Sequence, residues 1–164
     1  MIDSANVFDA VRRGYNEFQF SSDSDIVDYF SSIDAESIGG HVNNIKGILF
    51  ELEYTEQLDA QGIDANIFSE TNHPITDIYI MEDGEVINEM QLKATDSVSY
   101  IEETLQEHPD VEIVATSEVA AEVNSDMVID SGIENSVLED TVFDELINPI
   151  SGLSILGFIF GFGF

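Results

Sequence analysis

One predicted strand carries the residues whose types and spacing best fit chemistry. Residues 85–95 alternate in polarity, and in a strand successive side chains point to opposite faces. Glu89, Gln91 and Lys93 therefore share one face with Ile87. The chain has few cations, Lys and Arg together numbering 4, so a lysine inside a central strand is unexpected. Burying an ammonium group costs free energy unless it has a partner or a task.

A second candidate is a carboxylate on an otherwise apolar helix face. Residues 42–60 are predicted to form a helix that is apolar on two sides. One face holds Ile45, Ile48, Leu49 and Leu52. Glu51 lies on the other side, and its neighbours there are Gly47, Phe50, Tyr54 and Leu58. A helix of this pattern is packed inside a fold, where a carboxylate needs a partner or a task.

The order of these residues resembles a known family. Gly47-Ile48-Leu49-Phe50-Glu51 resembles the G-x-x-F-E helix of PD-(D/E)xK nucleases, in the branch that contains Mrr-like enzymes and Holliday-junction resolvases. Asp77 matches the metal-binding Asp of their second strand, and Gln91-Leu92-Lys93 matches their E-x-K motif in its Q-x-K form. The resemblance covers residues 40–116. It departs from the family at Thr76, because the residue before the Asp is not Pro.

The resemblance implies metal-dependent hydrolysis of phosphodiester bonds in DNA. This reaction needs an activated water and a way to hold charge on the phosphate oxygens. Asp77 would bind Mg²⁺ or Mn²⁺, with the amide oxygen of Gln91 and the main-chain carbonyl of Leu92 as further hard ligands. Lys93 would orient or help to deprotonate the attacking water and would offset charge on the phosphate.

Two further carboxylates complete the candidate site. Glu51 would reach the metal from its helix, and Glu89 could replace the charge lost where Gln91 stands for Glu. The candidate catalytic residues are thus Asp77, Gln91, Lys93 and Glu51, and the candidate metal ligands are Asp77, Gln91, Leu92, Glu51 and Glu89. The alternative is a structural salt bridge between Lys93 and Asp77 in a fold that has lost its activity.

The elements that must position these residues follow from periodicity. The helix at 42–60 precedes three strand candidates, and Asp83-Gly84 is a hairpin signal between the second and third. A later helix leads to a further strand, and such a crossover produces a parallel neighbour. The predicted strands are 64–70, 76–82, 85–95 and 111–116, and the remaining predicted helices lie at 97–107, 117–123, 136–147 and within 4–32.

This order predicts an α/β fold. The resemblance makes it a restriction-endonuclease-like core (helix, three-strand antiparallel meander, helix, parallel strand) with extra helices. We expect an N-terminal helical extension at 1–36, a nuclease-like domain at 37–147, and an apolar tail rich in Gly and Phe at 148–164.

Register decides whether Asp77 can join Gln91 and Lys93 on one face of the sheet. A regular two-residue loop at Asp83-Gly84 would place Asp77 on the wrong face, because a shift of one residue reverses every side chain. The hypothesis therefore predicts a three-residue turn or a β-bulge between Asp77 and Gln91, with a positive φ at Gly84.

The charge balance limits the kinds of partner that the protein can bind. Asp and Glu number 34 against 4 Lys and Arg, which gives a formal charge of −30. The acids are scattered, as on a surface suited to high salt, although an acidic mimic of nucleic acid that binds a basic partner is the other interpretation. Phosphate binding normally needs a basic surface, so a nuclease of this charge would need high salt or bridging divalent metals. There is no Cys, which excludes disulfides and thiolate sites.

The ends of the chain bear on location. Residues 150–164 carry no charge, yet they are too few for a transmembrane helix, which needs roughly 20 apolar residues. The first residues do not resemble a secretory signal. We expect a cytoplasmic protein that contacts a membrane, if at all, through residues 150–164.

The function predicted is a Mg²⁺-dependent DNA endonuclease of the restriction, defence or DNA-processing type, with DNA as partner and a homodimer left open. The alternatives are a catalytically inactive interaction module on the same fold, with an acidic protein-binding surface, and a membrane-associated toxin or effector. An open cleft at Lys93 would favour the nuclease, whereas a packed one would favour the module.

Overall fold

A five-stranded mixed sheet carries the predicted site residues. The computed structural model describes residues 1–148. The strands lie in the order β1-β2-β3-β4-β5, with β1, β2 and β3 antiparallel and β4 and β5 parallel to β3. They are β1 (Asp64–Ile67), β2 (Ile78–Glu82), β3 (Glu85–Lys93), β4 (Glu112–Ala115) and β5 (Val128–Asp130). The α/β class expected from the sequence is confirmed.

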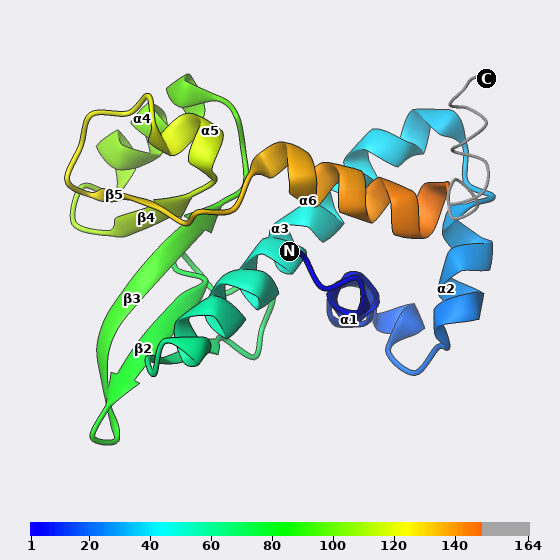
Figure 1. Cartoon of the computed structure of the whole chain (residues 1–164), viewed down its shortest axis with the longest axis horizontal. Coiled ribbons are helices and arrows are strands. Elements are labelled where there is room, and N and C mark those ends of the chain that lie inside the picture. The colour runs from blue at the N-terminus through cyan, green and yellow to red at the C-terminus, as the bar shows by residue number, and fades with distance from the viewer. Residues whose placement is uncertain (149–164) are drawn as a thin grey trace.

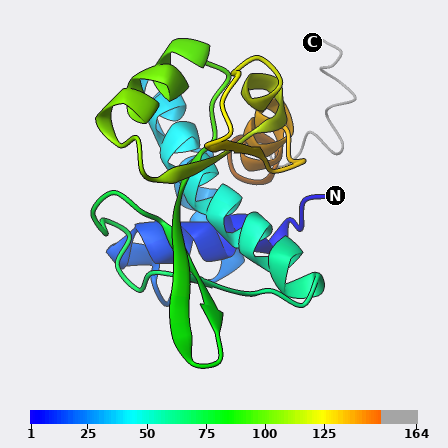
Figure 2. The same ribbon diagram turned by 90° about the vertical axis from the view of Figure 1, so that its left-hand side faces the viewer.

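One long helix links the sheet to the remaining helices. Figure 1 shows α3 crossing the molecule, with α4 and α5 beside the sheet at one end and α2 at the other. Figure 2 shows the β2–β3 hairpin extending away from the helices that pack around α3. The helices are α1 (Ala5–Gly14), α2 (Asp23–Phe30), α3 (Ala35–Ala60), α4 (Val98–Glu107), α5 (Ser117–Ala120) and α6 (Asn135–Val142), with a 3₁₀ turn at Asn16–Phe18 and a π-helical turn at Phe143–Ile147.

Two apolar clusters cover the two faces of the sheet. Met90 and Leu92 of β3 belong to the larger cluster, which α1, α3 and α6 complete. Ile113 of β4 belongs to the smaller cluster under α4 and α5. Since Gln91 pairs with Ile113 across the parallel ladder, the alternation of β3 puts Gln91 and Lys93 on the α4 side.

Some element boundaries differ from the sequence prediction. α3 begins at Ala35 and runs through Gly39 and Gly40, so the expected start at residue 42 is wrong. Glycine inside a helix costs about 1 kcal/mol, and just after these glycines the ring of His41 packs on Tyr15 and Phe30. The predicted boundary between residues 36 and 37 falls in the first turn of α3. The short strand β5 was not predicted.

The β2–β3 hairpin contains the predicted β-bulge. Asp83 and Gly84 form a two-residue loop with φ values of 52° and 81°, so a three-residue turn is wrong and the positive φ at Gly84 is confirmed. Further along, Met81 pairs with Val86 but Ile80 pairs with Asn88. The residue left over, at position 87, is the bulge that restores the parity required by the site.

The structure bears on only part of the membrane prediction. Within residues 1–148 no helix is long and apolar enough to cross a membrane. The apolar segment at 150–164, with its expected membrane contact, lies outside the described residues.

Candidate active site

Asp77 lies immediately before β2, with its carboxylate turned toward β3. Its Oδ2 accepts the main-chain N–H of Leu92 at 2.7 Å, and its own N–H donates to the carbonyl of Met90 at 2.9 Å. Burial raises the pKa of Asp77, an effect opposed by the Leu92 N–H and by the nearby charges of Lys93 and His73. The carboxylate is thus fixed by the backbone of the strand that carries the Q-x-K motif.

Gln91 is a buried amide beside Asp77. Ile78 and Met90 form an antiparallel pair whose side chains enter the larger core. Asp77 precedes Ile78 and Gln91 follows Met90, so both side chains lie on the opposite face of the sheet. Gln91 is 9% exposed, and its Oε1 has no hydrogen-bond partner. A buried acceptor without a partner carries a desolvation penalty of about 1–3 kcal/mol, which suggests a role other than packing.

Lys93 is held by an aromatic residue of α4. Its Nζ donates to the hydroxyl of Tyr100 at 2.8 Å and lies 4.9 Å from the centre of that ring. The ammonium is close enough to Asp77 to lower the pKa of that carboxyl. Within residues 1–148, however, Lys93 forms no ion pair within 4.0 Å; the pairs found are Arg12–Asp9, Arg12–Asp23 and Lys46–Glu139. The structural salt bridge between Lys93 and Asp77 is therefore not formed.

Glu51 approaches from α3. Its pKa is raised to about 8, first by burial and then by the charge of Asp77, while the charge of Arg13 opposes the shift. The effect of the Asp77 charge on the pKa of Glu51 indicates that these two carboxyls lie near each other, although Glu51 comes from a helix and Asp77 precedes a strand. At neutral pH Glu51 holds a proton, which keeps one negative charge out of this partly buried pair.

Two adjoining hollows open Glu51 and Lys93 to solvent, whereas Asp77 and Gln91 are not among the residues that line them. The Lys93 hollow, of about 640 Å³, is lined by Leu92, Lys93 and Tyr100 together with the α3 residues Gly40, Asn43, Asn44, Lys46 and Gly47. The Glu51 hollow, of about 270 Å³, is lined by Glu51, Gly14, Ile48 and Thr71. Asn43, Asn44 and Gly47 line both. A Cβ atom on Gly47 would meet no atom within 4 Å, so the strip between the hollows is open.

Glu89 does not join this group. Its Oε1 accepts the hydroxyl hydrogen of Thr76 at 2.8 Å, and its side chain is exposed beside a separate depression along the hairpin. The structure thus gathers Glu51, Asp77, Gln91 and Lys93, with Leu92 between them, and leaves Glu89 outside. Its bond to Thr76 instead fastens the segment that leads into Asp77.

The neighbours of the site include residues that the motif did not indicate. Arg13 of α1 bears on the pKa of Glu51 and donates to the carbonyl of Phe68. The ring of His73 stacks on Phe68 at 3.6 Å, and its Nδ1 donates to the carbonyl of Thr76 at 3.0 Å. The position of His73 shortly before Asp77 in the sequence could have indicated that it borders the site. No local pattern indicated Arg13, because α1 places it there through tertiary packing.

The donor set fits a hard divalent cation only in part. Carboxylate and amide oxygens are suitable ligands for Mg²⁺ or Mn²⁺, and Asp77, Glu51 and the unpartnered Gln91 Oε1 supply them. Within residues 1–148 no group of three or more His, Cys, Asp or Glu side chains is arranged to hold a metal. Two carboxylates and one amide are therefore the side chains on which a metal site here would depend.

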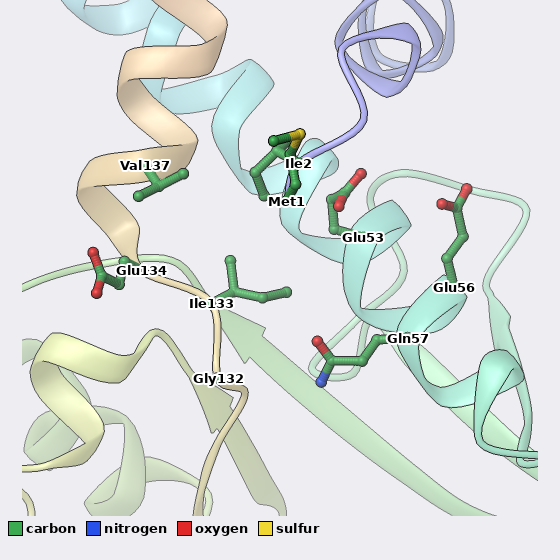
Figure 3. Close-up of a pocket in the computed structure, with 9 residues that line it drawn as sticks. All are labelled: Met1, Ile2, Glu53, Glu56, Gln57, Gly132, Ile133, Glu134 and Val137. Carbon is green, nitrogen blue, oxygen red and sulfur yellow. The ribbon is translucent and has the colours of Figure 1, made fainter.

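A further hollow lies on a different part of α3. Figure 3 shows it between the N-terminal segment, α3 and the start of α6. It measures about 510 Å³. Glu53 and Glu56 on its wall accept hydrogen bonds from Asn6 at 2.6 and 3.0 Å, and Glu134 is the third carboxylate there. Among the described residues, no lysine lines this hollow, in contrast to the Lys93 hollow.

Comparison of the chain with protein-family models, with curated proteins and with solved structures finds no match. The function must therefore be argued from the geometry of the site.

Proposed function

We propose that this protein is a metal-dependent nuclease of the PD-(D/E)xK superfamily, in its Mrr-like branch, and that it hydrolyses phosphodiester bonds in DNA. The observation that carries the proposal is the open hollow of about 640 Å³ at Lys93. A module that had retained the fold only as a scaffold would gain stability by packing this space or by pairing Lys93 with Asp77.

The distribution of positive charge supports an anionic ligand at this place. The chain has 34 acidic residues and 4 lysines and arginines. Lys46 and Lys93 line the Lys93 hollow, and Arg13 lies close enough to Glu51 to lower its pKa. A phosphate group meets repulsion over most of such a surface, and Lys93, which forms no ion pair within the described residues, favours its approach at this hollow.

The topology also agrees with the proposed superfamily. α3, the β1–β2–β3 meander, α4 and the parallel strand β4 follow one another in the order of a restriction-endonuclease-like core. α1, α2, α5 and α6 are then additions to it. The Gln at position 91 and the Thr at position 76 depart from the usual motif. The bulged hairpin places Asp77 on the same face as Gln91 but does not replace the missing Glu and Pro.

The residues have distinct proposed roles. Asp77 and Gln91 would hold the cation, and Glu51 would join them after losing its proton. When bound, Mg²⁺ or Mn²⁺ supplies a Lewis acid that offsets charge on the phosphate oxygens. Lys93 orients the attacking water and stabilises the charge that develops on the phosphate. The Leu92 N–H keeps the Asp77 carboxylate in place.

Plasmid cleavage tests this function. Purified protein is incubated with supercoiled DNA and Mg²⁺ or Mn²⁺ across a KCl series, and nicked and linear products are quantified. We expect cleavage that EDTA abolishes and that Lys93→Ala reduces by about 100-fold or more. Asp77→Asn should be equally inactive. Asp83→Asn is the matched control, because it makes the same change in the exposed hairpin loop. Absence of cleavage at every salt concentration with both metals would contradict the proposal.

A non-catalytic interaction module on the same fold is the second candidate, and the amide at Gln91 favours it because Glu at this position would add a metal-binding charge. The same experiment separates the two functions. A module would leave the plasmid intact, and its thermal unfolding would not respond to Mg²⁺ or Mn²⁺.

A further inference from the structure

Lys93 differs from Lys46 and Arg12 in its choice of partner, as Arg13, which donates to the carbonyl of Phe68, also does. Lys46 pairs with Glu139 at 2.9 Å, and Arg12 pairs with two aspartates. Lys93 belongs to the same acidic chain, yet its Nζ bonds to the neutral hydroxyl of Tyr100 at 2.8 Å. In a chain with 34 acidic residues, this arrangement calls for a physical cause.

Tyr100 holds the ammonium in two ways. The hydroxyl accepts a hydrogen bond, and the ring presents its face to Nζ at 4.9 Å from the centroid. The negative face of an aromatic ring attracts a cation by about 0.5–2 kcal/mol, depending on solvent exposure. Tyr100 is itself fixed at the first turn of α4, where its N–H donates to the Ser97 side chain at 3.3 Å.

The competing partner of Lys93 is Asp77. Asp77 lies opposite Gln91, which shares its strand face with Lys93, and its carboxylate accepts the N–H of Leu92, the residue before Lys93, at 2.7 Å. A flexible lysine side chain without Tyr100 would be free to move toward this buried carboxylate, because opposite charges attract strongly where water is scarce. Such a contact would neutralise Asp77 and fill the space next to the Gln91 amide.

We propose that Tyr100 is a positioning residue that keeps the ammonium of Lys93 away from Asp77, so that Asp77 and Gln91 remain available as oxygen donors. This inference rests on the proposed function of the site, because it assigns Lys93 and Asp77 separate tasks. Tyr100 lines the same hollow as Lys93 but takes no part in the reaction itself.

The first arm of the test needs neither metal nor activity. The Asp77 carboxyl is titrated by carbon-detected NMR in the metal-free protein, in Tyr100→Leu, and in both forms with Lys93→Met added. We expect Tyr100→Leu to lower the pKa of Asp77 by about one unit as Lys93 approaches it. In the Lys93→Met background the same substitution should change nothing. An unchanged pKa, or an equal shift in both backgrounds, overturns the proposal. Tyr100→Phe retains the ring and should give an intermediate shift.

The second arm measures Mn²⁺ binding by calorimetry for the same four proteins. Tyr100→Leu should weaken binding about tenfold, and Lys93→Met should remove that loss. Equal weakening in both backgrounds would mean that Tyr100 acts only on the fold, and it would overturn the positioning role. If the wild-type protein binds no Mn²⁺, the proposed metal site fails, while the NMR titration still decides whether Tyr100 separates Lys93 from Asp77.

Discussion

Glu51 is the residue whose environment departs most from that of a free carboxyl. Its pKa is raised to about 8 from 4.5 by burial and by Asp77. The folded protein therefore binds a proton that the unfolded chain releases between these two pH values. Because the folded state holds more protons there, the free energy of unfolding falls as pH rises from about 4.5 to about 8, and this contribution is constant above that range.

Replacing this carboxyl by an amide should reduce the pH dependence. For Glu51→Gln we expect a shallower fall in stability between pH 5 and 8, with a difference in slope of at most about 1.4 kcal/mol per pH unit. Urea unfolding at closely spaced pH values measures it. Glu82→Gln, at the exposed end of β2, is the matched control and should leave the slope as it is in the wild type. Parallel curves for wild type and Glu51→Gln would show that Glu51 is not perturbed.

Asp77 has a structural contact as well as a proposed chemical role, and two substitutions separate them. Asp77→Asn retains an oxygen that can accept the Leu92 N–H, so we expect loss of cleavage with a stability change below about 1 kcal/mol. Asp77→Ala leaves that N–H without its acceptor and should destabilise the fold by about 1–3 kcal/mol. Chemical denaturation and plasmid cleavage are measured on both. Equal stability losses would mean that the Leu92 contact contributes nothing.

At the scale of the element, the segment before β2 stores backbone strain. Ile75 has a φ of 69°, and the N–H of Thr76 donates to the carbonyl of Pro74 at 2.8 Å. This is the geometry of a classic γ-turn, which is rare and strained, above all for a β-branched residue. His73 Nδ1 donates to the carbonyl of Thr76 and the Thr76 hydroxyl donates to Glu89, and these two bonds hold the turn in place. The strain is thus imposed by the contacts that position Asp77.

Relieving this strain should be measurable. Ile75 is 48% exposed, so Ile75→Gly removes little buried surface while it removes the clash of the Cβ atom. We expect it to leave stability unchanged or raise it by up to about 1 kcal/mol. Val86→Gly is the control, since Val86 is 51% exposed and is not among the residues with a positive φ, and its loss should cost about 1 kcal/mol. Equal destabilisation by the two substitutions, measured by urea unfolding, would argue against strain at Ile75.

The elements that could be predicted are those with strong local periodicity. The hairpin at Asp83-Gly84, the helix α4 and the crossover to β4 follow from alternation and helical spacing, and the structure contains them. The start of α3 could not be predicted, because the contacts of His41 with Tyr15 and Phe30 near this end are tertiary, whereas the local signal is two glycines. β5 spans only Val128–Asp130 and owes its place to pairing with β4, which no local pattern encodes.

Part of the candidate site could be predicted from the sequence for a similar reason. The face shared by Gln91 and Lys93 depends only on strand parity, and the bulge followed from requiring Asp77 on that face. The neighbours that tertiary packing brings to the site could not be predicted. Tyr100 and Arg13 come from separate helices, and their contacts with Lys93 and Glu51 depend on how α4 and α1 pack.

At the scale of the whole molecule, the excess of acidic residues governs encounter with any polyanion. The formal charge of −30 produces a field that, at 0.1 M salt, extends about 10 Å from the surface, and at 1 M about 3 Å. A protein that binds DNA through a basic surface loses affinity for DNA as the salt concentration increases, because the release of counterions becomes less favourable. Here the dominant interaction outside the two hollows is repulsion, and salt weakens repulsion as well.

The proposed nuclease should therefore respond to salt in the opposite way to a basic DNA-binding enzyme. At fixed Mg²⁺ we expect kcat/KM for a short DNA duplex to rise as KCl increases from about 0.05 M to about 0.5 M, since screening shortens the range of the repulsive field. A small phosphodiester with a single charge, bis(p-nitrophenyl) phosphate, is the control substrate, and its kcat/KM should change much less because one charge meets far less repulsion. The variants Asp77→Asn and Lys93→Ala, inactive on both substrates, exclude a contaminating nuclease. A steep fall in kcat/KM for the duplex would mean that the local field of Arg13, Lys46 and Lys93 outweighs the net charge, and the account of encounter given for the whole molecule would then be wrong.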